Sequence, residues 1–194
     1  MKKLLIIAGK SGVGKDTVMR EVLAKTKGKS HKVITCTTRP KRENEIDGVD
    51  YYFKNELEFT SMIFEDKILE AQEFNEWFYG TPRESILDDV VNIIALSPEG
   101  IEGIYDVVTE KEMQIVVVYL VANDKIRIKR ALDREKEPDI REIFRRYETD
   151  EEDFEDFQCH LQLINETKTE LKNNVKLLTS LVKQMYEEEV IWKD

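Results

Sequence analysis

The stretch Gly9-Lys10-Ser11-Gly12-Val13-Gly14-Lys15 matches the pattern GxxxxGK and decides the fold class. It follows the apolar run 4–8, which is typical of a buried parallel strand, and it precedes a helical pattern over 17–25. Glycines let such a loop curl until its N–H groups point at phosphate oxygens, and the helix start adds partial positive charge. Lys15 would then reach the β- and γ-phosphates of a bound triphosphate. The sequence therefore predicts a phosphate-binding loop (P-loop).

The residues that follow the loop depart from the usual pattern. A Ser or Thr normally follows the lysine, and its hydroxyl ligates Mg²⁺, whereas here Asp16 comes first and Thr17 second. We expect Thr17 to hold Mg²⁺, and the presence of Asp16 leaves the identity of the metal ligand open. The residues predicted to bind ATP in this region are Gly9, Ser11, Gly12, Val13, Gly14, Lys15, Asp16 and Thr17.

Apolar runs continue to alternate with helical patterns along the chain. Ser97-Pro98 suits a helix start with Ser97 as the N-cap, and Thr167-x-x-Glu170 is a capping box that opens a C-terminal helix. Strands that alternate with helices predict an α/β fold with a parallel, doubly wound sheet. Strands are expected at 33–36, 91–96, 115–121 and 161–164, and helices at about 98–107 and 124–134.

Residues 37–80 interrupt this alternation. They contain polar turns, the aromatic runs 51–53 and 77–79, and a helical segment near 56–65. The stretch is too long for a loop and too structured for a linker. We expect a small inserted subdomain that carries a substrate.

The composition argues against several other classes of protein. The net charge of −10 disfavours nucleic acid as the main partner, since duplex-binding domains carry a basic face. Cys36 and Cys159 have neither CxxC spacing nor neighbouring histidines, so we expect no structural zinc and a reducing, cytoplasmic location. No segment approaches the length of a membrane span, so we expect a soluble protein without a membrane partner. The sequence does not indicate an oligomeric state.

A set of motifs between residues 37 and 82 is more specific. In order along the chain, the motifs are TTRPKR at 37–42, EIDGVDYYF at 45–53, ILE at 68–70 and YGTP at 79–82. Their order and spacing resemble those of the guanylate kinase family, and the resemblance covers roughly residues 3–166. It implies a three-layer P-loop NTPase fold with a small inserted α+β subdomain for a nucleoside monophosphate (NMP) and a helical lid. We expect a single domain whose core is 1–36, 83–124 and 158–194, with the NMP-binding subdomain at 37–82 and the lid at 125–157.

The chemistry of these motifs suits a nucleotide on its own terms. Arg39 and Arg42 offer forked donors to a phosphate, and tyrosine hydroxyls donate without adding charge. The carboxylate of Glu70 can accept both N1–H and N2–H of guanine, and Thr81 can donate to O6. The resemblance implies that Arg39, Arg42, Tyr51 and Tyr79 bind the acceptor phosphate, with Thr35 in place of a serine there, and that Glu70 and Thr81 bind the base.

The predicted lid also resembles that of the family. It carries arginines in the segment where the family has arginines that close over ATP. Phosphoryl transfer depends mainly on positioning and on neutralising charge, so no general base is required. Arg130 is assigned to ATP, and the expected catalytic residues are Lys15, Arg134, Arg145 and Arg146, of which the last two are interchangeable in this role.

One segment departs from the family. Where the family shows two aspartates in a pattern like IDxDxxG, residues 95–100 read ALSPEG, so Ala95 and Ser97 stand at the acidic positions. The choice of base is therefore left open. Ser97 keeps a hydroxyl and remains an NMP-binding candidate, although its role as a helix N-cap is favoured over a contact with the base.

These features together predict an enzyme that transfers the γ-phosphoryl group of ATP to GMP or dGMP with Mg²⁺. One alternative is a kinase for another (deoxy)nucleoside monophosphate. A second is a catalytically inactive guanylate-kinase-like binding module, although such modules usually lose the phosphate loop. A different P-loop NTPase would leave the motifs between 39 and 81 unexplained.

Overall fold

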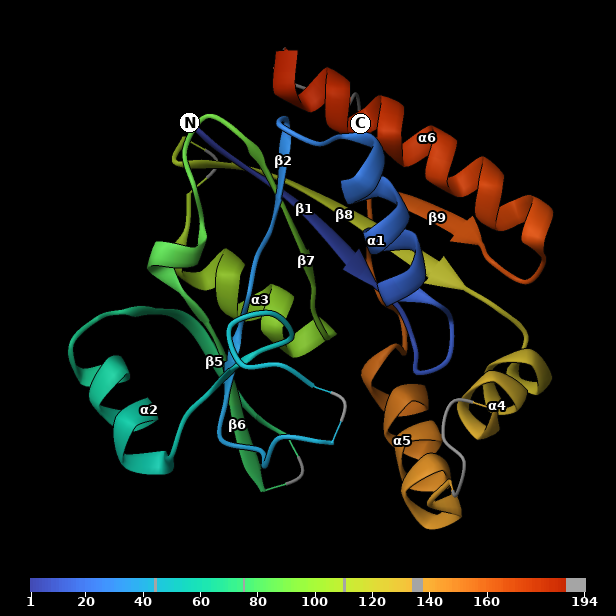
Figure 1. Ribbon diagram of the computed structural model, residues 1–194, viewed down its shortest axis with the longest axis horizontal. Helices are drawn as coiled ribbons and strands as arrows, with labels where there is room; N and C mark the ends of the chain where they lie inside the picture. Colours follow the sequence, from blue (N-terminus) through green and yellow to red (C-terminus); the bar gives the residue numbers. More distant parts are fainter. Residues whose placement is uncertain (44, 75, 110, 134–137, 188–194) are drawn as a thin grey trace.

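The computed structural model describes residues 1–43, 45–74, 76–109, 111–133 and 138–187. Its main sheet has five parallel strands in the order β2-β7-β1-β8-β9, as Figure 1 shows. The central strand carries five consecutive buried residues, as expected of a parallel strand covered on both faces. The strands are β1 (Lys2–Ala8), β2 (Ser30–Lys32), β7 (Val91–Ala95), β8 (Met113–Val121) and β9 (Leu161–Ile164).

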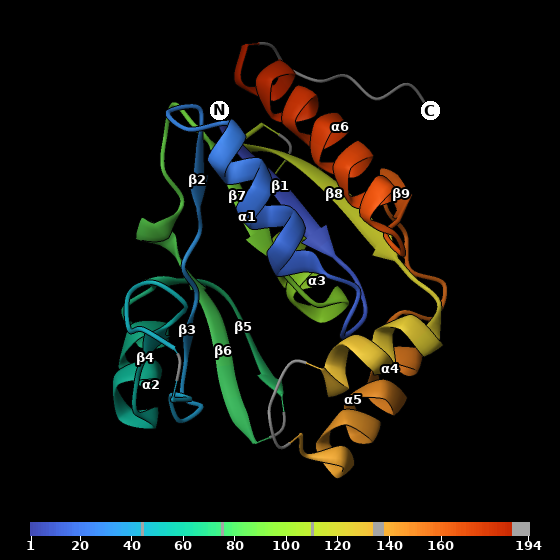
Figure 2. The ribbon, with the colours of Figure 1, turned by 45° about the vertical axis from the view of Figure 1, so that its right-hand side comes forward.

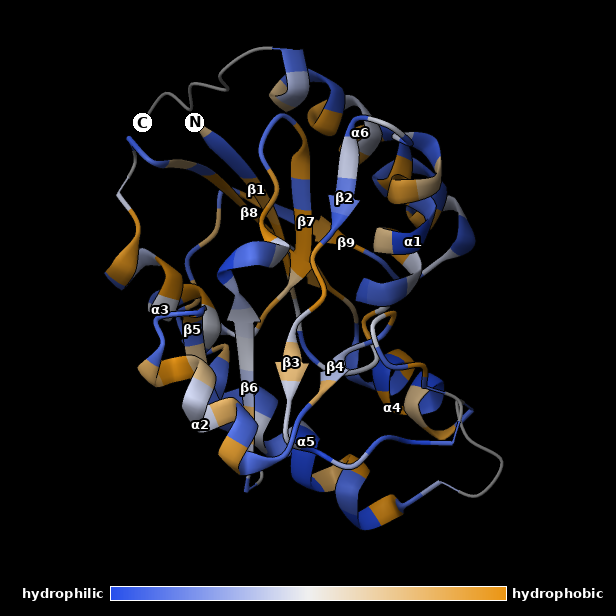
Figure 3. Ribbon diagram, turned by 60° about the vertical axis from the view of Figure 1, so that its left-hand side comes forward, coloured by the Kyte–Doolittle hydropathy of each residue, from blue (hydrophilic) through white to orange (hydrophobic). Residues whose placement is uncertain are grey.

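Helices cover both faces of this sheet and complete the three layers. Helices α1 (Lys15–Lys25) and α6 (Lys168–Glu187) lie on one face, and α3 (Pro98–Val107) lies on the other (Figure 2). Side chains of β1 alternate between the two faces: Leu5 and Ile7 pack beneath α1 and α6, while Leu4 and Ile6 pack beneath α3. Figure 3 shows hydrophobic residues concentrated in the inner strands such as β7, whereas the edge strand β2 is hydrophilic. The predicted doubly wound α/β fold is confirmed.

A second, smaller sheet is built from the chain between β2 and β7. Its strand order is β4-β3-β6-β5, so β5 forms one edge. The buried ring of Phe59 in the covering helix packs against Cys36 and Ile68 of this sheet. The elements are β3 (Cys36–Thr37), β4 (Tyr52–Phe53), helix α2 (Glu56–Phe64), β5 (Ile68–Phe74) and β6 (Trp77–Pro82), followed by a 3₁₀ turn, η1 (Arg83–Ser85).

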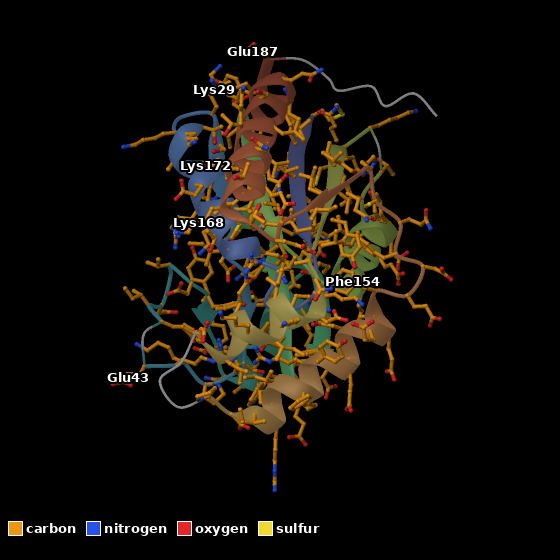
Figure 4. All side chains as sticks on the ribbon, turned by 90° about the vertical axis from the view of Figure 1, so that its right-hand side faces the viewer. Lys29, Glu43, Phe154, Lys168, Lys172 and Glu187 are labelled. Carbon is orange, nitrogen blue, oxygen red and sulfur yellow. The ribbon has the colours of Figure 1, made fainter. Side chains whose placement is uncertain are left out.

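A pair of helices lies across from the second sheet, beyond the carboxyl ends of β1 and β8 (Figure 2). These are α4 (Asp124–Leu132) and α5 (Ile140–Asp153). Phe154, which follows α5 and is labelled in Figure 4, stacks on Tyr119 of β8 with 5.1 Å between ring centroids. The C-terminal end of α5 is thereby tied to the main sheet. The helix predicted over 124–134 ends at Leu132, and Arg134 lies outside the described residues.

The C-terminal helix begins as predicted. The carboxylate of Glu170 accepts the N–H of Thr167 at 2.8 Å, and the N–H of Glu170 donates to the Thr167 hydroxyl at 3.2 Å, which is a capping box. At its other end, Glu187 pairs with Lys29 at 2.6 Å (Figure 4). Within the described ranges, no helix is long and apolar enough to cross a membrane.

One predicted strand is wrong. The sequence favours a strand at 33–36, but β2 ends before Val33 and β3 begins at Cys36 in the other sheet. The intervening residues cross between the sheets: the N–H of Val33 donates to β7, whereas the carbonyl of Thr35 accepts the N–H of Tyr52 at the start of β4. Because apolar residues stand on both sides of the crossing, the sequence presents two short strands as one run.

Candidate active site

The P-loop curls between β1 and α1 as predicted. Its three glycines have φ values of +153° at Gly9, +78° at Gly12 and +99° at Gly14. A Cβ built on Gly12 would lie 2.4 Å from the carbonyl oxygen of Arg127, so a larger residue does not fit there. Lys15 turns its ammonium back over the loop, where Nζ donates to the carbonyl of Gly9 and, at 3.4 Å, to that of Lys10. The loop therefore holds its curled form, with the lysine over it.

A buried arginine joins the P-loop to α4 and α5. The guanidinium of Arg127, only 3% exposed, donates to the carbonyl of Ser11 at 3.1 Å and to the carboxylate of Asp150 at 2.9 Å. Asp150 also accepts the N–H of Ser11 at 2.6 Å. Two further carboxylates, from Asp124 and Glu151, contact the same guanidinium at 2.8 and 3.3 Å. Residues of the predicted lid thus contact the tip of the phosphate loop directly.

Arg130 lies at the base of the P-loop. Its guanidinium donates to the carbonyls of Val13 at 3.1 Å, Asn165 at 2.9 Å and Glu166 at 2.8 Å. The buried side chain of Asn165 donates to the same Val13 carbonyl at 2.8 Å. Both groups support the loop from behind, and they connect it to the end of β9.

The first turn of α1 offers oxygen atoms that suit Mg²⁺. Asp16 is exposed, and the hydroxyl of Thr17 makes no hydrogen bond within the described part of the chain. Mg²⁺ prefers oxygen ligands and usually keeps waters and substrate phosphates, so one or two protein oxygens suffice. Across the described residues there is no cluster of three or more His, Cys, Asp or Glu side chains that could hold a metal alone. The residues present fit an ion shared with nucleotide phosphates.

Arg39 is a buried cation in the loop that follows β3 of the second sheet. It is 6% exposed and pairs with Glu45 at 2.7 Å, and its guanidinium lies over the ring of Tyr51 at 5.6 Å from the centroid. Burial alone would raise the pKa of Glu45, but hydrogen bonds from Arg39 and the backbone of Arg42 lower it below its usual range. The carboxylate of Glu45 thus occupies the position beside Arg39 that we predict for the acceptor phosphate.

Two tyrosines lie beside this arginine. The rings of Tyr51 and Tyr79 meet edge to face with 6.1 Å between centroids. Burial, and then the charges of Tyr79 and Asp16, raise the pKa of Tyr51. Thr35 lies half-buried in the crossing between the two sheets.

Glu70 is a buried carboxylate on β5. Its Oε1 accepts the hydroxyl of Thr81, across the strand pair in β6, at 2.6 Å. Its Oε2 is buried with no hydrogen-bond partner in the described residues. Burial raises the pKa of Glu70 to about 7, partly offset by the Thr81 hydrogen bond. The structure thus brings together the two residues predicted for the base and leaves one carboxylate oxygen uncommitted.

Ser97 is the N-cap of α3, as predicted. Its Oγ accepts the N–H of Gly100 at 3.2 Å. The same hydroxyl donates to Oε1 of Gln72 in β5 at 2.6 Å. Ala95, the other residue at an expected acidic position, ends β7.

The two described lid arginines of α5 share one acid. Glu142 accepts from Arg145 at 2.8 Å and from Arg146 at 2.7 Å, and the hydrogen bond from Arg145, with that from Arg146, lowers the pKa of Glu142 to about 2. Arg145 also lies over the ring of Phe74 at 5.2 Å, so α5 touches the end of β5. The fourth predicted lid arginine, Arg134, lies outside the described residues.

These features match one family across nearly the whole chain. The family model described as guanylate kinase matches residues 1–185. The chain belongs to the guanylate kinase family. A guanylate kinase of Prochlorococcus marinus (strain MIT 9312) is 33% identical over 186 residues, which cover 91% of this chain and 97% of that protein. A shorter alignment with guanylate kinase of Thermobifida fusca (strain YX) is 44% identical over 86 residues, or 44% of this chain and 43% of that protein.

Solved structures agree on the fold. The crystal structure of guanylate kinase from Anaplasma phagocytophilum matches with a TM-score of 0.68 at 18% identity, and the match covers 96% of this chain and 87% of that one. The predicted P-loop fold and the predicted family are both confirmed. Members of this family are nucleoside monophosphate kinases, which are phosphotransferases.

Several residues of this region are not singled out by the sequence. Arg127 and Asp150 hold the P-loop tip, and Gln72 and Phe74 follow Glu70 on the same face of β5. For the two residues of β5 a signal does exist, because they stand two and four positions after Glu70 in a strand. Arg127 and Asp150 lie among many other charged residues, so the sequence does not distinguish them from their neighbours.

Proposed function

We propose that this chain transfers the γ-phosphoryl group of ATP to GMP or dGMP, with Mg²⁺ as cofactor. The observation that supports this acceptor best is Glu70, whose buried carboxylate has one oxygen on Thr81 and one with no partner among the described residues. Guanine brings two donors, N1–H and N2–H, to a single carboxylate. Adenine has no matching pair at that edge, and a buried carboxylate left unpaired costs about 1–3 kcal/mol or more.

The proposed donor site is the P-loop. It belongs to the core, which comprises residues 1–36, 83–124 and 158–194. The loop's N–H groups and Lys15 would hold the β- and γ-phosphates. Residues 37–82 would bind the monophosphate, and residues 125–157 would form the lid. The segregation of the second sheet from the main sheet supports this division.

The proposed reaction forms one bond and breaks one. An oxygen of the GMP phosphate bonds to the γ-phosphorus of ATP while that phosphorus separates from the β–γ bridging oxygen, which yields ADP and GDP. Arg39 and Arg42, with the hydroxyls of Tyr51 and Tyr79, would hold the acceptor phosphate in line. Mg²⁺, when bound by Thr17 or Asp16 together with the phosphates, would neutralise part of their charge.

The lid arginines would neutralise the transferred group. Arg145 and Arg146 are paired with Glu142, which keeps two guanidinium groups side by side on α5. A phosphoryl group carries more negative charge than one carboxylate, so it would compete well for them. Arg130 would support the P-loop and the bound ATP, and Arg134 keeps its proposed catalytic role.

The complete P-loop weighs against an inactive binding module.

The described cysteines are free, which supports a reducing, cytoplasmic location. The chain carries a net charge of −10, which supports action on free nucleotides rather than on nucleic acid.

Chromatography of a mixture of ATP, GMP, Mg²⁺ and the protein tests the proposal. We expect equal amounts of ADP and GDP. Lys15→Ala should lower the rate roughly a hundredfold, about 3 kcal/mol in transition-state stabilisation, whereas Lys25→Ala, at an exposed position of the same helix, should not. Binding of GMP without formation of GDP would instead support the binding-module alternative.

A further inference from the structure

We propose that Gln72 is a second base-binding residue. Its side-chain amide lies on the side of Glu70 that faces α3 and donates a hydrogen bond to N3 of the purine. This inference rests on the proposed function, since it takes the base to face Glu70. The first support is position. Gln72 stands two residues after Glu70, so both side chains lie on one face of β5, with their Cα atoms about 7 Å apart.

The second support is the packing of α3 against this strand. A Cβ built on Gly103 would lie 3.2 Å from Cβ of Glu70, and one built on Gly100 would lie 3.1 Å from Nε2 of Gln72. Two glycines one helical turn apart thus let α3 approach the edge strand closely. Helix α3 therefore covers the Gln72 amide on one side of Glu70, and β6 with Thr81 lies on the other side of Glu70.

The third support is the direction of the amide. The oxygen of Ser97 accepts the N–H of Gly100, and its proton is donated to Oε1 of Gln72 at 2.6 Å. The acceptor end of the amide is therefore occupied. Nε2 has no hydrogen-bond partner within the described residues, and it offers two N–H donors.

The edge of guanine identifies what these donors would meet. Its groups follow in the order O6, N1–H, N2–H and N3, which is acceptor, donor, donor, acceptor. If the Thr81 hydroxyl turns its single proton from Glu70 to O6 when the base binds, and Glu70 accepts the two central donors, the next group toward α3 is N3. A donor at this place is complementary, whereas a carboxylate would repel the N3 lone pair. Because adenine also carries N3, Gln72 adds affinity for purines in general, and the choice between guanine and adenine stays with Glu70.

Calorimetric binding of GMP and of its 3-deaza analogue, which lacks the N3 acceptor, tests this role. We expect the wild type to bind GMP about 2- to 10-fold more tightly than the analogue, as one neutral hydrogen bond allows. In Gln72→Ala the ratio should fall to about 1, and AMP binding should weaken by the same factor as GMP binding. Ser97→Ala, which frees the amide, should lower the ratio in part. Gln162→Ala, an exposed glutamine on β9, should keep it.

Three results would overturn the assignment. A Gln72→Ala protein that still prefers GMP over the analogue by the wild-type factor, with an unchanged melting temperature, removes Gln72 from the base site. A wild type that phosphorylates GMP but does not distinguish the analogue overturns the role of Gln72 alone. A wild type that does not bind GMP overturns both this role and the proposed function.

Discussion

The carboxylate of Asp150 in α5 accepts the backbone N–H of Ser11 in the P-loop at 2.6 Å. The same carboxylate pairs with Arg127 at 2.9 Å, and Arg127 in turn donates to the carbonyl of Ser11. Both backbone polar groups of Ser11 are therefore held by the two helices of the proposed lid. A charged cluster thus joins the nucleotide loop to the segment expected to close over it.

Removing Asp150 should destabilise the protein. In Asp150→Ala the guanidinium of Arg127, which is 3% exposed, keeps Asp124 and Glu151 but loses its most buried partner. The N–H of Ser11 also loses its acceptor. We expect the free energy of unfolding to fall by about 1–3 kcal/mol in urea titrations. Glu148→Gln, an exposed change on the same helix, should leave it unchanged; equal losses in both variants would mean that the cluster contributes nothing specific.

Arg39 should act on the monophosphate and not on ATP. The residue is already paired with an anionic group, Glu45, and a phosphate can take that place. We expect Arg39→Ala to raise the KM for GMP about 10- to 100-fold, the range of a charge-assisted contact, with the KM for ATP little changed. Lys41→Ala, at an exposed neighbouring position, is the matched control. A selective loss of ATP affinity in Arg39→Ala would show that residues 37–82 do not hold the acceptor.

Glu70 should make stability depend on pH. Burial raises its pKa to about 7, above the value of 4.5 in the unfolded chain, so the folded protein binds this proton more tightly. The resulting stabilisation is complete below pH 4.5 and is lost as the pH rises through 7. Glu70→Gln stays neutral, and we expect its free energy of unfolding at pH 9 to exceed that of the wild type by up to about 3 kcal/mol, with the difference vanishing near pH 4.

The control for this titration is Glu73→Gln, an exposed change on the same strand, which should follow the wild type. The carboxylate form is also the one that accepts guanine donors, so GMP binding to the wild type should strengthen as the pH rises through 7. Identical pH profiles for wild type and Glu70→Gln would contradict the raised pKa.

Much of the main sheet could be predicted from the sequence, because β1 and β8 contain continuous apolar runs, whereas β2, which reads SHK, carries no such signal. The strand 161–164 and the helix 98–107 have the predicted bounds, the latter because Ser97 and Pro98 mark its start chemically. The second sheet could be predicted only as a structured insert. Strand β5 reads ILEAQEF and loses the regular alternation that marks a half-buried strand, because its covered face carries the polar residues Glu70 and Gln72 toward α3 and the proposed base site.

The candidate site divides in the same way. Residues such as Arg39, Glu70 and Thr81 stand in contiguous motifs, so the resemblance assigns them from the sequence alone. The contacts of Arg127 and Asp150 depend on how α4 packs against the P-loop and α5. The spacing of residues in a charged run does not distinguish a buried arginine from its solvated neighbours. Gln72 differs from these two, because its spacing of two from Glu70 is visible in the sequence, but the close approach of α3, which two glycines permit, is not.

The central claim is that the uncommitted oxygen of Glu70 selects guanine. The most direct measurement is kcat/KM for GMP, dGMP, AMP, CMP, UMP and dTMP with saturating ATP and Mg²⁺, followed by ADP release. We predict that GMP and dGMP exceed every other acceptor by at least about tenfold, and that Glu70→Gln removes most of this preference. A wild type that phosphorylates AMP or a pyrimidine monophosphate faster than GMP and dGMP would contradict the account.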